Sequence, residues 1–284
     1  MNDNHMKGKI IFITGATSGI GKETAKGLAK LGANVVFTTR DIKKGEQVKD
    51  EIIRKTNNNH INILFCDLAS FESIRTCYMK FFNQYNSLDI LINNAGVLNF
   101  KRTLTKDGVE SNFAINYLAP FLITNLFLPL LRKSTQSRII NVTSGLQSGS
   151  INFDDIEYKH NFSGWDAYRQ SKLALILFTR YLANQLKETS ITVNCVHPGM
   201  TNTNLVRNAG WLKRVYFKLK GNNPSRSAEA LIYLASSLDL IGITGEYFFR
   251  KEIKKSSTES YDMNVAKQLW VLSKNYVGLS NNKK

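Results

Sequence analysis

The chain has 284 residues, of which 43% are hydrophobic and 11% aromatic, and it carries a formal net charge of +16 at neutral pH. This composition excludes an intrinsically disordered or fibrous chain, because it supplies enough apolar surface for a packed core. The positive charge allows nucleic acid, an acidic membrane surface or an anionic small molecule as a partner, and it does not choose among them.

Apolar, β-branched runs alternate with helical patterns along the chain. We predict strands at Lys9–Thr14, Val35–Thr39, Asn62–Cys66, Leu88–Asn93, Arg138–Thr143, Thr192–His197 and Glu246–Phe249. We predict helices at about Gly19–Leu31, Ile42–Lys55, Phe71–Tyr85, Lys106–Leu131, Trp165–Lys187 and Ser225–Ser237. Strand alternating with helix predicts a parallel sheet with helices on both faces. Without an internal repeat or a low-complexity linker, residues 1–284 are expected to form one doubly wound α/β domain with a mainly parallel seven-stranded sheet.

Cysteine usage and the first residues of the chain bear on the compartment. Cys66, Cys77 and Cys195 form no CxxC pair. An odd, scattered set is typical of reduced thiols and not of a disulfide framework or a zinc site. The polar Met1–Lys9 segment leads directly into a strand, so we expect no signal peptide. These features favour an intracellular, cytoplasmic location.

One predicted helix contains an uncharged stretch, Ser111–Leu131, that is long enough to cross a bilayer. It also contains Asn112, Asn116, Pro120 and Pro129. Polar groups at bilayer depth are costly, and prolines interrupt a helix. A helix buried in the protein, or packed against a partner, is therefore favoured over a membrane span.

A glycine-rich turn follows the first predicted strand and opens the first predicted helix. It reads Thr14-Gly15-Ala16-Thr17-Ser18-Gly19-Ile20-Gly21. Glycines let the backbone turn tightly and approach a ligand, while the free N–H groups and dipole of the helix favour a pyrophosphate. A purely structural turn is the alternative, but the strand-turn-helix context favours a nucleotide site.

The second predicted strand ends in Thr38-Thr39-Arg40-Asp41. At this place a carboxylate would bind the 2′-hydroxyl of NAD, whereas an arginine suits the 2′-phosphate of NADP. Arg40 favours NADP(H), because its planar fork matches a phosphate, and Asp41 fits better as the N-cap of the next helix. A solvated surface charge is the alternative role for Arg40.

Six segments occur together in a characteristic order: Thr14–Gly21, Asp67-Leu68, Asn93–Gly96, Ser144, Tyr168–Lys172 and Pro198-Gly199. With them, residues 9 to about 250 resemble the short-chain dehydrogenase/reductase family. Finer features resemble its retinol dehydrogenase branch, namely Thr39–Asp41, Leu91–Val97, Ala167–Leu173, His197–Gly199 and Ala266–Trp270. The resemblance implies a Rossmann fold and hydride transfer between a nicotinamide cofactor and an alcohol or carbonyl.

The resemblance implies four catalytic residues: Asn116, Ser144, Tyr168 and Lys172. Tyr168 and Lys172 are four residues apart, so they share a helix face, where the ammonium would favour the phenolate over the ordinary phenol. Tyr168 would then serve as acid in carbonyl reduction and as base in alcohol oxidation. Ser144 would hold the substrate oxygen, and Asn116 would order water toward the lysine. In many relatives the helix that carries Asn116 packs against a second subunit, so a homodimer is possible.

The same resemblance implies a set of cofactor contacts, with NADP(H) favoured over NAD(H). They are Gly15, Thr17, Ser18, Gly19, Ile20, Gly21, Arg40, Asp67, Leu68, Asn94, Ala95, Gly96, Tyr168, Lys172, Pro198, Gly199, Thr201 and Thr203. We interpret His197 as a buried histidine at a strand end. We expect no metal, because no histidine pair has zinc-ligand spacing and hydride transfer of this kind needs none.

A substrate lid is expected at about residues 200–224. Its segment Leu205–Lys220 mixes apolar residues at helical spacing with five cations, Arg207, Lys213, Arg214, Lys218 and Lys220. Such a helix can lie on an anionic membrane, as a weak peripheral contact, or cover an apolar pocket with its charges in water. Both suit an apolar substrate.

We therefore predict an NADP(H)-dependent oxidoreductase that interconverts an alcohol and a carbonyl on an apolar substrate such as a retinoid or lipid aldehyde. A non-enzymatic NADP-binding scaffold or redox sensor is the alternative. Specific nucleic-acid binding is disfavoured, because the basic residues are spread along the chain without a recognition motif.

Overall fold

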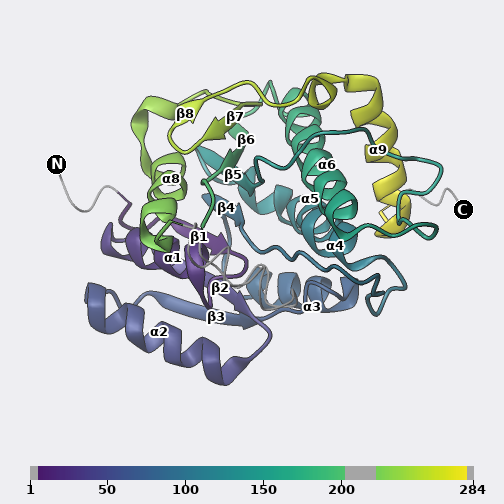
Figure 1. Cartoon of the computed structure of the whole chain (residues 1–284). Coiled ribbons are helices and arrows are strands. Elements are labelled where there is room, and N and C mark those ends of the chain that lie inside the picture. Colours follow the sequence, from purple (N-terminus) through teal and green to yellow (C-terminus); the bar gives the residue numbers. More distant parts are fainter. Residues whose placement is uncertain (1–5, 202–221, 280–284) are drawn as a thin grey trace, which may run out of the picture.

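The computed structural model describes residues 6–201 and 222–279, which build a twisted sheet between two layers of helices (Figure 1). The strands are β1 Ile10–Ile13, β2 Asn34–Thr39, β3 Ile61–Phe65, β4 Ile90–Asn93, β5 Ser137–Val142, β6 Ile191–His197, β7 Tyr247–Phe249 and β8 Glu252–Ile253. They lie in the order β3-β2-β1-β4-β5-β6-β7-β8, and every pair is parallel except β7–β8. The doubly wound α/β fold expected from the sequence is confirmed.

The sheet has one strand more than the seven expected. The additional strand, β8, is only two residues long, is exposed, and pairs antiparallel with β7 through Phe248–Ile253 and Phe249–Glu252. The turn that joins them places Arg250 at a positive φ of 57°. A charged two-residue edge strand carries no alternating apolar pattern, so the sequence gives no signal for it.

Helices cover both faces of the sheet. They are α1 Gly19–Lys30, α2 Ile42–Thr56, α3 Phe71–Phe82, α4 Ser111–Phe113, α5 Ala119–Leu131, α6 Gly164–Gln185, α8 Pro224–Ser236 and α9 Met263–Tyr276. Short 3-10 turns lie at Leu238–Leu240 and Thr258–Tyr261. In Figure 1, α1, α2 and α8 lie on one side, and α3, α4, α5, α6 and α9 on the other.

Neighbouring side chains of β1 pack into two separate hydrophobic cores. Ile11 and Ile13 belong to the cluster under α1, α2 and α8, whereas Phe12 belongs to the cluster under α3, α5 and α6. All three side chains are at most 1% exposed. This is the pattern of a strand covered on both faces, where successive side chains enter opposite layers.

The described cysteines Cys66, Cys77 and Cys195 are also buried, and all are free thiols.

The helix predicted at Lys106–Leu131 begins five residues later, at Ser111. The carboxylate of Glu110 accepts hydrogen bonds from the backbone N–H groups of Asn112, at 2.8 Å, and Phe113, at 2.8 Å. This side chain therefore caps the helix and fixes its start. From Ser111 the chain runs through α4, a π-helical turn at Ala114–Leu118, and α5.

Within the described residues, Ser111–Leu131 is the one helical stretch with the length and hydropathy of a membrane span, and 78% of its window is buried inside the protein. Asn116 and Thr124 are completely buried there. The burial agrees with the prediction of a core helix, since its apolar side chains already have partners within this chain.

The last helix, α9, was not predicted and covers α6 on the outside (Figure 1). Its Trp270 lies among three aromatic rings, with centroid distances of 5.0 Å to Phe121, 5.9 Å to Phe178 and 5.2 Å to Tyr181. Aromatic contacts of this kind add to the burial that holds a terminal helix in place. The helix thus shields part of the α5–α6 face.

Candidate active site

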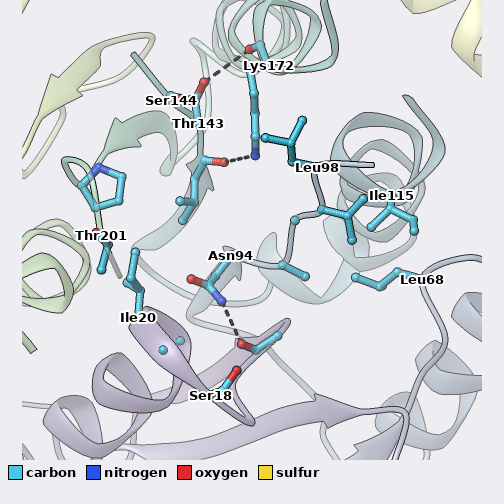
Figure 2. Close-up of a pocket in the computed structure, with 18 of the residues that line it drawn as sticks. Ser18, Ile20, Leu68, Asn94, Leu98, Ile115, Thr143, Ser144, Lys172 and Thr201 are labelled. Atoms are coloured by element: carbon cyan, nitrogen blue, oxygen red, sulfur yellow. Dashed lines mark hydrogen bonds between the residues drawn. The ribbon is translucent and has the colours of Figure 1, made fainter. Parts of the chain in front are cut away.

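A cavity of about 530 Å³ opens at the carboxyl ends of the parallel strands (Figure 2). In open α/β sheets this is the edge where ligands bind. Residues expected at the site line it at both ends: Gly15, Thr17, Ser18, Gly19, Ile20, Gly21, Arg40, Asp67, Leu68, Asn94, Ala95, Gly96, Ser144, Tyr168, Lys172, Pro198, Gly199 and Thr201. Thr203 and the lid segment Leu205–Lys220 lie outside the described residues. Asn116 is not in the cavity wall, although its neighbour Ile115 is.

Glycine is required in the turn between β1 and α1. Gly15 and Gly19 have positive φ angles of 70° and 58°. A Cβ on Gly15 would lie 2.8 Å from the Cα of Ala95, and one on Gly21 would overlap the carbonyl oxygen of Gly15 and the Asn94 side chain. The backbone of this turn therefore approaches the end of β4 more closely than any other residue type allows.

Asn94 fixes the turn from the neighbouring strand. Its side-chain amide donates hydrogen bonds of 2.9 Å to the Thr14 carbonyl and 3.1 Å to the Gly15 carbonyl. Figure 2 shows the Asn94 side chain with one of these bonds, in the lower part of the view. Ser18 precedes α1 and makes no side-chain cap bond, so its hydroxyl is left to the cavity that it lines. The exposed N-terminus of α1, held in this way, fits a pyrophosphate.

Arg40 and Asp41 end β2 with different roles. Arg40 is exposed and lines the cavity, and no carboxylate in the described part of the chain forms an ion pair with it. Asp41 instead caps α2, because its carboxylate accepts a 3.0 Å hydrogen bond from the N–H of Lys44. The N-cap role expected for Asp41 is confirmed, and of these two charged residues it is Arg40 that lines the cavity.

Tyr168 and Lys172 share the inward face of α6. Tyr168 is 4% exposed and Lys172 is 3% exposed, and the lysine nitrogen lies 5.7 Å from the centroid of the tyrosine ring. The ammonium of Lys172 donates a 3.0 Å hydrogen bond to the carbonyl of Val142, drawn in Figure 2. Because a charge in this position has lost most of its water, burial lowers the pKa of Lys172 to about 8.

The pKa of Tyr168 is raised, and not lowered by Lys172 as we expected from the sequence. Burial raises the pKa of Tyr168 to about 12, against a smaller lowering by its hydrogen bond with Ser144. Desolvation disfavours the phenolate, and the ammonium is directed at the Val142 carbonyl and not at the phenol oxygen. The spacing of Tyr168 and Lys172 predicts their shared helix face but not how deeply they are buried. Burial decides the direction of the Tyr168 pKa shift.

Ser144 follows β5 at the cavity wall. Its Oγ accepts a 3.1 Å hydrogen bond from the N–H of Leu146. The Ser144 side chain also forms a hydrogen bond with the side chain of Tyr168. The preceding Thr143 is buried and donates a 3.3 Å hydrogen bond to the Lys172 carbonyl. Ser144 and Tyr168 thus place two hydroxyl groups together, where one oxygen of a ligand can accept from both.

Asn116 lies inside the π-helical turn and is completely buried. Its Oδ1 accepts from the N–H of Val97 at 2.8 Å, and its Nδ2 donates to the Val97 carbonyl at 2.9 Å and to Ser171 Oγ at 3.0 Å. Isolated π-helical turns are frequent at functional sites. The side chain of Asn116 thus supports the cavity wall from behind.

His197 lies at the end of β6, as expected, but it is only partly buried and lines the cavity. Burial and the positive charges of Arg250 and Lys172 lower its pKa to about 4, so the imidazole is neutral at physiological pH. Its ring lies 5.3 Å from that of Phe249.

Several apolar residues that the sequence did not lead us to expect also line the cavity: Leu98, Ile115, Leu146, Trp165 and Met200. Of these, Leu98 and Trp165 pack with Tyr168. Trp165 meets the ring of Phe100 edge-on at 5.3 Å. Its position three residues before Tyr168 places both on one helix face, and this spacing could have revealed it.

Comparison with known proteins gives the family. The family model for short chain dehydrogenases matches residues 9–211. This chain is a member of the short-chain dehydrogenase/reductase family. It is therefore an enzyme of the oxidoreductase class, in a family that binds a nicotinamide cofactor and acts on small alcohols and carbonyl compounds.

Curated relatives of this short-chain dehydrogenase include retinol dehydrogenase 13 of Homo sapiens, 39% identical over 96% of this chain and 85% of the relative. Polyprenol dehydrogenase of Homo sapiens is 37% identical, over 95% of this chain and 86% of the relative. The predicted family and its retinol dehydrogenase-like branch are confirmed.

Solved structures agree with the fold. An uncharacterised protein from Mycobacterium paratuberculosis superposes with a TM-score of 0.79 at 30% identity, over 97% of this chain and 95% of the other. A short-chain dehydrogenase from Escherichia coli CFT073, solved with NADPH, superposes with a TM-score of 0.70 at 24% identity, over 89% of this chain and 100% of the other.

Proposed function

We propose that this enzyme interconverts an alcohol and a carbonyl on an apolar substrate, with NADP(H) as the cofactor. The observation that carries the proposal is the convergence of Ser144, Tyr168 and Lys172 on the cavity that Arg40 and the glycine turn also line. When bound, the nicotinamide supplies or accepts the hydride.

The protein's own part in carbonyl reduction is to hold and protonate the substrate oxygen. Ser144 donates a hydrogen bond to that oxygen, and Tyr168 transfers its phenol proton to it as the carbonyl carbon is reduced. The raised pKa of Tyr168, about 12, keeps this proton in place until charge develops on the oxygen. In oxidation the same atoms run in reverse, and Tyr168 accepts the alcohol proton. The buried ammonium of Lys172 stabilises the phenolate, which is left after reduction and which must be present before oxidation.

The preference for NADP(H) rests on Arg40. Its guanidinium stands at the end of β2, where the cavity begins, and Asp41 is occupied as a helix cap. The 2′-phosphate of NADP can accept two hydrogen bonds from the Arg40 guanidinium. The 2′-hydroxyl of NAD would instead need a carboxylate at the same place.

An apolar substrate is supported by the apolar part of the cavity wall. Leu146 and Met200 are 42% and 46% exposed at the cavity, and Trp165 and Leu98 continue the apolar surface toward Tyr168. Exposed apolar groups at a ligand site are covered at least cost by an apolar ligand. The names of the relatives, retinol and polyprenol dehydrogenases, agree with a retinoid or another lipid alcohol or aldehyde.

The test is a substrate panel of retinoid, lipid and aromatic aldehydes, each run with NADPH and with NADH. We expect turnover of apolar aldehydes with NADPH and at least a hundredfold loss in Tyr168→Phe, which keeps the ring and removes the proton. Equal rates in the two proteins would remove Tyr168 from the mechanism. A preference for NADH would overturn the role of Arg40 but leave the reaction type in place.

A homodimer, a cytoplasmic location and a weak peripheral contact with membranes are part of the same proposal. The high positive charge supports attraction to anionic lipid. Light scattering of the purified enzyme tests the dimer. Sedimentation with vesicles of neutral lipid, with and without phosphatidylserine, tests the membrane contact, and equal sedimentation in both would exclude an electrostatic origin.

A further inference from the structure

Ser171 occupies a central place between the elements that form the site. It is completely buried on α6, between Tyr168 and Lys172, and it is not part of the cavity wall. Its hydroxyl donates a 2.7 Å hydrogen bond to the backbone carbonyl of Tyr168, one turn earlier. The same oxygen accepts the 3.0 Å hydrogen bond from Asn116 Nδ2. Both capacities of one hydroxyl are thus used in a fixed direction.

These bonds leave the amide of Asn116 a single orientation. Val97 N–H needs an acceptor, and the Ser171 oxygen, whose proton is committed to Tyr168, needs a donor. Only Oδ1 toward Val97 and Nδ2 toward Ser171 satisfies both, which is the arrangement found. Reversing the amide would place its Nδ2 against the N–H of Val97 and its Oδ1 against the Val97 carbonyl, and the Asn116 side chain is completely buried.

The result is a connection between three separate elements. Val97 follows the Asn94–Gly96 turn at the end of β4, Asn116 belongs to the π-helical turn, and Ser171 ties both to the backbone turn that carries Tyr168. A π-helical turn is a local departure from regular helix geometry and persists where its surroundings stabilise it. Lys172 is held independently, by its bond to Val142.

We propose that Ser171 is a positioning residue, which sets the place of the Tyr168 phenol by joining the Tyr168 carbonyl to Asn116. This inference rests on the proposed role of Tyr168. Because a small displacement of a reacting group lowers the rate of chemistry more than the binding of ligands, its signature is a loss in kcat with an unchanged cofactor Kd.

The chain offers a matched control in Ser273. It is also completely buried on a helix, its hydroxyl donates a 2.7 Å hydrogen bond to the carbonyl of Leu269, and it bonds the Tyr117 hydroxyl at 2.6 Å. It therefore supports the same π-helical turn at the next residue, but from α9 and not from the helix of Tyr168. Ser171→Ala and Ser273→Ala remove the same atom from comparable surroundings.

The experiment measures kcat, the cofactor Kd, the pH profile of kcat and the denaturation midpoint for wild type and both variants, on the substrate that wild type turns over best. For Ser171→Ala we expect a kcat about 10- to 100-fold lower, an unchanged Kd and a shifted pH profile. For Ser273→Ala we expect a similar loss in stability and a kcat close to wild type. Ser171→Thr, which keeps a hydroxyl, should recover part of the lost kcat.

Equal kcat values in Ser171→Ala and Ser273→Ala would overturn the proposal, because they would reduce Ser171 to a packing residue. So would a Ser171→Ala variant with wild-type kcat and pH profile. Tyr168→Phe, measured in parallel, distinguishes a failure of the proposed role of Tyr168 from a failure of the proposed role of Ser171. If Tyr168→Phe stays active, the proposed role of Tyr168 fails; if it is inactive while the two serine variants agree, only the role of Ser171 fails.

Discussion

The ammonium of Lys172 donates a 3.0 Å hydrogen bond to the carbonyl oxygen of Val142, the last residue of β5. This contact joins α6, which carries Tyr168, to the strand that leads into Ser144. The bond lies in a region where Lys172 is 3% exposed, so the charge is held with little help from water. A buried lysine of this kind has a measurable effect on the stability of the protein.

Replacing Lys172 with methionine should change how stability depends on pH. In the unfolded chain the lysine pKa is near its ordinary 10.5, and in the folded protein it is about 8. Between these values the unfolded state binds more protons, so the stability of wild type increases as pH rises through this window. Relative to Lys172→Met, the free energy of unfolding of wild type should gain about 2 kcal/mol between about pH 7 and about pH 9.5.

Urea denaturation of the cofactor-free proteins at the two pH values measures this difference. The comparison must stop below pH 10, because the raised pKa of Tyr168 makes stability fall above that value. Parallel pH dependence in wild type and Lys172→Met would show that the ammonium is not desolvated in the folded protein.

Adding one methyl group to the glycine turn should prevent cofactor binding. In Gly21→Ala the new Cβ would overlap the backbone carbonyl of Gly15, which cannot move without displacing the turn. We expect the cofactor Kd to rise at least about tenfold, measured by fluorescence titration. Gly27→Ala is the control on the same helix, because there the Cβ meets only the end of the Ile232 side chain. An unchanged Kd in Gly21→Ala would place the pyrophosphate elsewhere.

Removing the guanidinium of Arg40 should change cofactor preference and little else. A charge-assisted hydrogen bond to phosphate contributes about 1.5–3 kcal/mol, so the KM for NADPH should rise about 10- to 100-fold in Arg40→Ala. The KM for NADH should stay the same, since no 2′-phosphate is lost. Lys43→Ala is the control for a general loss of positive charge, because Lys43 is exposed and is not part of the cavity wall. Equal losses with both cofactors would contradict the assignment.

Truncating Trp165 should weaken the binding of bulky apolar substrates. The indole lines the cavity beside Tyr168 and packs edge-on against Phe100. In Trp165→Ala we expect the KM for long apolar aldehydes to rise about tenfold, with a smaller change for a short aldehyde such as propanal. Trp270→Ala removes the same kind of side chain from its contacts with Phe121 and Phe178. It should reduce stability without a larger KM change for long than for short aldehydes. The same KM ratio in both variants would remove Trp165 from the substrate site.

Some of the site could be predicted from sequence because its chemistry is local. The glycines of Thr14–Gly21 are needed by the backbone of that turn itself, and Tyr168 and Lys172 share a face because helices repeat every 3.6 residues. The alternation of apolar strands and helical patterns likewise predicted the seven strands β1 to β7 and their mainly parallel sheet. In contrast, β8 is stabilised by its pairing with β7, and α9 by packing against residues of α5 and α6. No short sequence pattern predicts these contacts.

Long-range contacts were decided by the tertiary structure alone. The residues of the Asn116–Ser171 bond are 55 apart in sequence, and those of the Lys172–Val142 bond are 30 apart. The direction of the Tyr168 pKa shift also came from burial, which depends on what packs around the ring. The sequence by itself determined the reaction class through its resemblance to a family, because the motifs that carry the resemblance are short and local. The tertiary structure decided which groups are desolvated and which hydrogen bonds hold them, because these properties arise only when distant segments pack together.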